Sequence, residues 1–218
     1  MSSYSYLCVL LAIIPTGFSL QCIQCSDPGG QFCNGIHVNC GPASDVCMSS
    51  LIQEEINTSD PNSLNILQIT RTSSYRYIRD CGTSSDCDKV VILRTPYNRM
   101  VTSNRCCRSN LCTPESPRSI PEGSQNGVTC PGCLTFINQE CAAYKAVYCR
   151  GDEKYCFHFS SKPLKDDNLT FAMKGCATQS ACNLELEFLN KVVCTDKGHG
   201  LDLSLLVIAT CLGIKLLY

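Results

Sequence analysis

The segment CGTSSDC at residues 81–87 returns as CATQSAC at residues 176–182, with the same cysteine spacing and the same Thr and Ser positions. Working outward from each copy, the cysteines before it also repeat. Each array opens with C-x2-C, has its next cysteine after seven residues, and continues with two more at gaps of six or seven. This shared spacing indicates an internal duplication. The first array is Cys22, Cys25, Cys33, Cys40, Cys47, Cys81, Cys87, Cys106, Cys107 and Cys112, and the second is Cys130, Cys133, Cys141, Cys149, Cys156, Cys176, Cys182 and Cys194.

The composition explains how such short repeats can fold. The chain has 218 residues, 20 cysteines and no Trp. Cysteine at this density in a short chain is typical of a disulfide scaffold. A module below about 70–80 residues rarely obtains more than roughly 3–5 kcal/mol from its apolar core, so covalent cross-links must supply the rest. We therefore predict an all-β protein of two tandem small disulfide-rich modules, at residues 22–112 and 130–194. Residues 113–129 hold three prolines and two glycines and are expected to form a semi-extended linker.

Both ends of the chain carry apolar segments. Residues 1–19 are predicted to be a signal peptide, because an apolar run is followed by small residues at a peptidase-like spacing. Secretion places the cysteines in an oxidising compartment. The tail at residues 195–218 contains an apolar run that is too short to span a bilayer, which needs about 20 residues. It fits a glycolipid (GPI) anchor signal, with Asp196 or Gly198 as the attachment site, or else an uncleaved tail on a soluble protein.

Cysteine counting supports both processing predictions. Removing the two end segments takes Cys8 and Cys211, so that 20 minus 2 leaves 18 cysteines. The remaining cysteines divide into ten and eight across the linker, and neither module is left with an odd thiol.

The segments between the cysteines have the pattern of strands. Residues 89–94 are a β-branched run closed by Pro96, and residues 65–71 and 75–80 are expected to form two strands around a Ser-rich turn. Alternation of Leu169, Phe171 and Met173 with polar or small residues predicts a further half-buried strand. Because the cysteines lie near the ends of these hairpins, we expect a cross-linked hub from which the hairpins project.

The complete cysteine pattern resembles the urokinase-receptor-type three-finger family (uPAR/Ly6), which also includes cell-surface complement regulators and snake neurotoxins. The likeness covers nearly all of residues 22–194. Thr113 departs from the Asn that usually follows the last cysteine, so a looser closure of the first module is expected. The tandem of a ten-cysteine and an eight-cysteine module is similar to the gamma-type phospholipase A2 inhibitors, and residues 173–182 and 191–196 are the most similar stretches.

The disulfide pairing comes from the resemblance alone, since spacing leaves many pairings open. It implies Cys22–Cys47, Cys25–Cys33, Cys40–Cys81, Cys87–Cys106 and Cys107–Cys112, and in the second module Cys130–Cys156, Cys133–Cys141, Cys149–Cys176 and Cys182–Cys194. Each such bridge typically contributes about 2–4 kcal/mol, chiefly by restricting the unfolded chain.

The residues give little support to catalysis or cofactor binding. The two C-x2-C pairs could begin zinc or redox sites, but disulfides are favoured in a secreted chain. His37, His158 and His199 belong to no recognisable catalytic motif. A secreted phospholipase is excluded because no His follows the adjacent cysteines at 106 and 107. We therefore expect a protein that is not an enzyme and that has no cofactor or metal. A net charge of −1 gives no positive electrostatic potential that would attract nucleic acid.

What remains is protein binding. Asn57 and Asn168 lie in glycosylation sequons and are expected to face solvent. Arg94 and Arg99, with neighbouring arginines, could meet an acidic partner or form a solvated face. Tyr75, Tyr77 and Tyr97 are candidate contacts or hub covers. The resemblance implies inhibition of secreted phospholipase A2 by direct contact; the alternative is a GPI-anchored receptor or adhesion protein at the cell surface.

Overall fold

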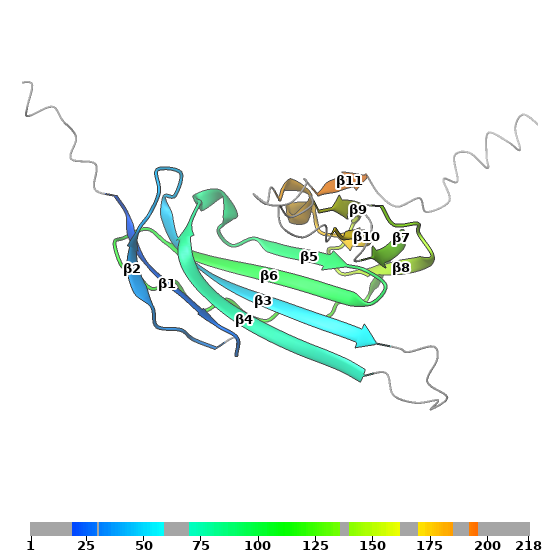
Figure 1. Cartoon of the computed structure of the whole chain (residues 1–218), viewed down its shortest axis with the longest axis horizontal. Coiled ribbons are helices and arrows are strands. Elements are labelled where there is room, and N and C mark those ends of the chain that lie inside the picture. Colours follow the sequence, from blue (N-terminus) through cyan, green and yellow to red (C-terminus); the bar gives the residue numbers. More distant parts are fainter. Residues whose placement is uncertain are drawn as a thin grey trace, which may run out of the picture.

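The computed structural model describes residues 19–29, 31–58, 70–135, 140–161, 170–184 and 192–195. These residues form an all-β structure whose strands join in one hydrogen-bonded network (Figure 1). Module 1 contains β1 (Gln21–Asp27), β2 (Ile36–Asn39), β3 (Val46–Thr58), β4 (Thr70–Gly82), β5 (Val90–Arg94) and β6 (Asn98–Cys107). Module 2 contains β7 (Gln125–Thr135), β8 (Lys145–Arg150), β9 (Tyr155–Ser160), β10 (Ala172–Ala177) and β11 (Val193–Thr195).

Helix is confined to two short 3₁₀ turns in the described residues, η1 (Ser84–Asp86) and η2 (Gln179–Asn183). Each lies in one copy of the repeated C-x5-C segment, so the sequence repeat corresponds to a structural one. Within the described ranges, no helix is long and apolar enough to cross a membrane.

The longest hairpin is formed by β3 and β4, with thirteen residues in each strand. The prediction of a Ser-rich turn between residues 71 and 75 is wrong, because Ser73 and Ser74 lie inside β4 opposite Glu55 and Glu54. Serine favours turns in isolation, but pairing along the whole of β3 overrides that local preference. The expected strand at residues 65–71 lies mostly outside the described residues.

Nine disulfides cross-link the described residues, and their pairing is the one that the resemblance implies. Cys22, Cys40 and Cys47 are buried together at one end of the module 1 hairpins. In module 2 the equivalent cluster contains Cys130, Cys149, Cys156 and Cys176. The hairpins thus extend from two hubs built largely from sulfur.

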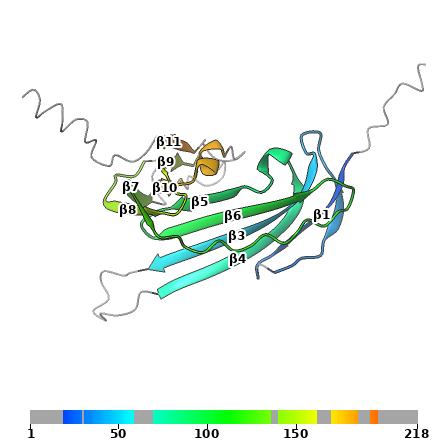
Figure 2. The same cartoon turned by 180° about the vertical axis from the view of Figure 1, so that it is seen from behind.

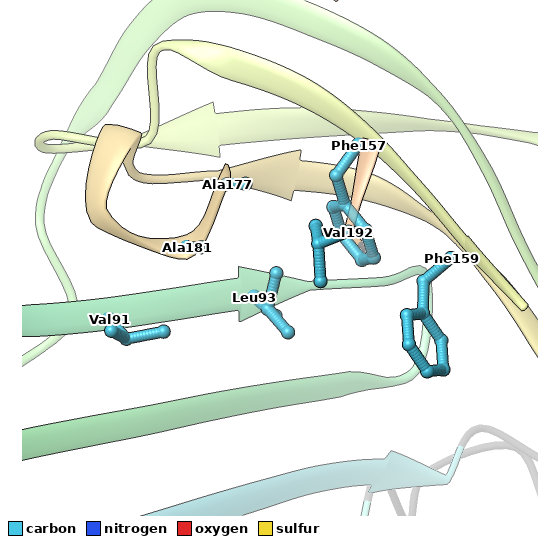
Figure 3. Close-up of a cluster of buried hydrophobic side chains, with 7 residues drawn as sticks. All are labelled: Val91, Leu93, Phe157, Phe159, Ala177, Ala181 and Val192. Atoms are coloured by element: carbon cyan, nitrogen blue, oxygen red, sulfur yellow. The ribbon is translucent and has the colours of Figure 1, made fainter. Parts of the chain in front are cut away.

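The two modules share a strand pairing and an apolar core. At the junction, Cys176 and Ala177 of β10 pair with Arg94 and Leu93 of β5. Figure 3 shows Val91 and Leu93 of β5 facing side chains from module 2. The complete cluster comprises Val91, Leu93, Phe157, Phe159, Ala177, Ala181 and Val192, and the partly buried Phe171 and Met173 pack against it. Neither module would bury these side chains alone, so the junction is a packed interface.

Gly175 permits this close approach. A Cβ atom added to Gly175 would lie 1.8 Å from the carbonyl oxygen of Arg94. No side chain fits in that space, and a glycine is therefore required where β10 crosses β5.

The linker runs along the back of the module 1 sheet (Figure 2). Since β7 already begins at Gln125, we define residues 113–124 as the linker strap. Ser49 and Ser103 donate hydrogen bonds of 2.9 and 3.0 Å to strap carbonyls, and Ser119 of the strap donates one of 2.7 Å to Gln53. At its start, Thr113 accepts a hydrogen bond of 3.1 Å from Arg79. The strap covers one face of β3 and β6 with polar contacts.

Several sequence predictions lie outside the described residues. These are the signal peptide up to residue 18, the second sequon at Asn168, the possible attachment sites Asp196 and Gly198, and the tail from residue 196 onward.

Candidate protein-binding surface

Three of the five predicted contact residues are buried, so their assignment to a binding surface is wrong. Arg94, Arg99 and Tyr77 expose 8%, 2% and 2% of their surface. The strand register explains the error: Arg99 lies opposite Glu55 and Tyr77 opposite Leu51. Directly opposed residues share a face of the sheet, and this is the face that the strap covers.

Arg94 holds the two modules together. Its Nε donates to Glu153 Oε2 at 2.8 Å and its Nη2 to Glu153 Oε1 at 3.0 Å, while its Nη1 donates to Glu122 Oε1 at 2.7 Å. Burial alone would lower the pKa of Arg94, but the hydrogen bonds and charge of Glu153, followed by those of Glu122, raise it above its ordinary value. A bidentate arginine–carboxylate pair stabilises the contact and also fixes the relative orientation of the two side chains. We call Arg94, Glu122 and Glu153 the junction clamp.

Arg99 fixes the strap to the sheet. Its Nη1 lies 3.2 Å from Glu55 Oε1, and its Nη2 donates to the carbonyl oxygens of Ile120 and Pro121, each at 3.2 Å. Gln53 donates a further hydrogen bond of 2.7 Å to Glu55. The charge of Arg99 is therefore used inside the fold and is not offered to a partner.

Tyr97 does reach the surface, at a place that involves both modules. It lies in the turn between β5 and β6, and its ring centroid is 6.3 Å from that of Tyr144 in module 2. The ammonium group of Lys145 lies 5.4 Å from the centroid of the Tyr97 ring. Burial, and then the side chain of Tyr97, raise the pKa of Tyr144. These contacts assemble one composite patch from two modules.

Tyr148 extends the same patch along β8. Tyr144 and Tyr148 expose 55% and 59% of their surface, which is unusual for side chains of this size. A shallow pocket next to them is lined by Pro96, Lys145 and Tyr148, among others. We call Tyr97, Tyr144, Lys145 and Tyr148 the junction surface. Exposed tyrosines are enriched at protein contact sites.

The sequence around β8 already indicates which of its residues are exposed. Tyr144, Ala146 and Tyr148 alternate with Lys145, Val147 and Cys149. This alternation predicts a strand with one side buried, and the buried residues are indeed Val147 and Cys149. The contact tyrosines predicted from the sequence all belong to module 1, so Tyr144 and Tyr148 were missed.

The remaining exposed apolar side chains are dispersed. Phe32 and Ile36 belong to the first hairpin of module 1, Ile56 and Tyr75 lie toward the far ends of β3 and β4, and Val193 is on β11 of module 2. Tyr75 thus keeps the exposed position that the sequence suggested. Asn57 lies on β3 opposite Arg71, close to that same end.

The described residues show no grouping suited to catalysis. His37 on β2 and His158 on β9 are both exposed and belong to different modules, whereas His199 is outside the described residues. The two clusters of potential metal ligands are Cys22, Cys40 and Cys81, and Cys130, Cys149 and Cys176. All six sulfurs are in disulfides and so lack the thiolate that a metal requires.

Comparison with known proteins places these features in a family. No family model matches the chain. A phospholipase A2 inhibitor of the gamma type from Gloydius brevicaudus siniticus is 32% identical over 188 residues, covering 84% of this chain and 86% of the relative. Phospholipase A2 inhibitor NAI of Notechis ater is 30% identical over 195 residues, covering 87% and 90%.

Among solved structures, mouse TEX101 covers 81% of this chain at 15% identity, with a TM-score of 0.30, a likeness too weak to bear on the arrangement of the modules. A match over 84% or 87% of this chain must include parts of both cysteine arrays and the linker between them. This chain therefore belongs to the family of the gamma-type phospholipase A2 inhibitors, three-finger proteins of the Ly6/uPAR type.

Proposed function

We propose that this protein inhibits a secreted phospholipase A2 outside the cell by binding it directly and blocking its access to lipid. The observation that carries the proposal is the similarity to named phospholipase A2 inhibitors over 84% and 87% of this chain, which includes both modules. A rigid two-module body with exposed tyrosines supports it, because a preorganised surface loses little conformational entropy on binding.

The proposal assigns no catalytic step to the chain itself. Inhibition then requires only that the bound inhibitor cover the part of the enzyme surface that contacts lipid. We further propose that residues 1–19 are removed on secretion, so that the disulfides form in an oxidising compartment.

The test is an inhibition assay with the secreted, processed chain and purified pancreatic or venom phospholipase A2 acting on phospholipid vesicles. We expect lipid hydrolysis to fall as the inhibitor concentration rises, with a parallel signal for a complex in size-exclusion chromatography. Unchanged hydrolysis at micromolar inhibitor with both enzymes would refute the proposal. The reduced and alkylated chain serves as the control, because it retains the composition but not the modules.

The apolar run at residues 203–214 supports a second candidate, a GPI-anchored receptor or adhesion protein of the same fold. Treating expressing cells with a phosphatidylinositol-specific phospholipase C distinguishes the two. Release of the chain from the cell surface favours the anchored form, and its direct appearance in the medium favours the secreted inhibitor.

A further inference from the structure

Among the described residues, β8 is an edge strand with no partner on its outer side. In the part of the chain that the structure describes, β8 pairs with β7 alone, whereas β7 also pairs with β10. The outer edge of such a strand presents backbone N–H and C=O groups that another extended chain can use. Addition of a strand to a sheet edge is a recurrent mode of peptide recognition.

The side chains along β8 add specific contacts to this edge. Tyr144 and Tyr148 are four positions apart and therefore point to the same side of the strand, with Ala146 between them. The Tyr97 ring continues this apolar strip across the junction, since it packs against Tyr144. Large, flat side chains with one polar end are the residues that most often dominate binding energy.

The free charge at this edge is positive. Arg94 and Arg150 also line the adjacent pocket, but Arg94 pairs with Glu153 and Glu122, and Arg150 Nε lies 3.4 Å from Glu122. Lys145 is exposed, and among the described residues no carboxylate pairs with it. A partner segment bearing carboxylates complements this charge, whereas a basic segment would be repelled.

The two strands that end the main sheet path suit this role less well, and the outer edge of β4 at residues 70–76, which β1 does not pair, carries one exposed tyrosine instead of two. β2 has four residues and β11 has three, against six in β8. A longer edge provides more backbone hydrogen bonds. Unlike β2 and β11, β8 with the residue directly before it presents an exposed lysine and two exposed tyrosines.

We propose that the outer edge of β8, together with the junction surface, binds an extended carboxylate-bearing segment of the partner protein as an added strand. This inference rests on the proposed function in taking that partner to be a secreted phospholipase A2. The junction surface contains residues from both modules. The junction clamp, which holds the modules together, therefore also fixes the geometry of binding.

The experiment compares binding of pancreatic phospholipase A2 to the processed chain and to two variants, Tyr144→Ser/Tyr148→Ser and Lys145→Glu, by surface plasmon resonance. Each variant should weaken binding by roughly tenfold or more, as expected for central contact residues. Phe32→Ser and Arg108→Glu are the matched controls, because they change an exposed aromatic residue and an exposed cation of module 1. Both controls should bind within about twofold of the unmodified chain.

Hydrogen exchange on the unmodified chain supplies a readout that needs no substitution. Amides at residues 145–149 should exchange more slowly in the complex than in the free protein. If the unmodified chain binds the enzyme but the β8 variants bind equally well and these amides are unprotected, this inference is overturned while the proposed function stands. If the unmodified chain neither binds nor inhibits the enzyme, both proposals are overturned.

Discussion

Arg94 and Glu153 form a two-pronged buried ion pair across the junction, although they lie 59 positions apart in the sequence. Glu153 is almost fully buried, and its Oε2 also accepts a hydrogen bond of 3.0 Å from the backbone N–H of Arg150. The carboxylate therefore links β5, the turn after β8 and, through Arg94, the strap residue Glu122. This carboxylate thus adds to the strand pairing and the apolar cluster in fixing how the two modules are oriented.

Glu153→Leu should destabilise the junction by about 3 kcal/mol, because the buried Arg94 loses two charge-assisted hydrogen bonds and keeps, among the described residues, Glu122 as its one carboxylate partner. The measurement is guanidinium unfolding of the disulfide-intact protein, with X-ray scattering to detect separation of the modules. Asp152→Leu, at the exposed neighbouring position, should have little effect. Combining Glu153→Leu with Arg94→Met should recover part of the loss, and equal stability of Glu153→Leu and the unmodified protein would contradict the role of the clamp.

Gly175→Ala should disrupt the pairing of β10 with β5. The new methyl group would lie 1.8 Å from the Arg94 carbonyl oxygen, so the backbones must separate. We expect a loss of about 1–3 kcal/mol, which is typical of overpacking. Gly41→Ala is the control, since a Cβ there has no heavy atom within 4 Å. Equal thermal midpoints for both variants would show that the junction tolerates the displacement.

The sequence predicts the modules better than it predicts their assembly. Cysteine spacing and strand alternation are local, so the fold class and the resemblance follow from short segments such as residues 81–87. The burial of Arg94 and Arg99 depends on partners that lie 59 and 44 positions away. No local sequence pattern distinguishes an arginine that faces solvent from one that pairs with a carboxylate across a sheet. For the same reason, the sequence did not reveal that Tyr77 is buried.

The linker illustrates the same limit. Its prolines and glycines predict an extended chain, but composition alone does not reveal that the chain lies along a sheet. The serines that hold it, at positions 49 and 103, are unremarkable members of strands β3 and β6. Their role becomes visible only when the strand register places them on the covered face.

Arg99→Met should loosen the linker strap. The variant keeps much of the side-chain volume but loses the hydrogen bonds to the Ile120 and Pro121 carbonyls. Trypsin should then cleave after Arg118 roughly tenfold faster, because cleavage requires local opening and each tenfold corresponds to about 1.4 kcal/mol. Mass spectrometry of the Arg118–Ser119 cut measures the rate.

Arg105→Met provides the matched control for that experiment, since it removes an arginine of the same strand whose carboxylate partner, Asp88, is exposed. Its cleavage rate after Arg118 should equal that of the unmodified chain. Equal rates in all three proteins would show that Arg99 does not hold the strap.

Reduction should unfold both modules. Cystine sulfurs form the centre of each hub, and the largest apolar cluster lies at the junction, where it depends on both modules being folded. With each bridge contributing about 2–4 kcal/mol, loss of all nine exceeds the 5–15 kcal/mol that typically holds a domain folded. Circular dichroism of the reduced and alkylated chain should lose its β signature, while alkylation without reduction should leave the spectrum unchanged. A reduced chain that kept its β spectrum would mean that hydrogen bonds and apolar packing suffice, and the sulfur hubs would then have to be reinterpreted as secondary supports.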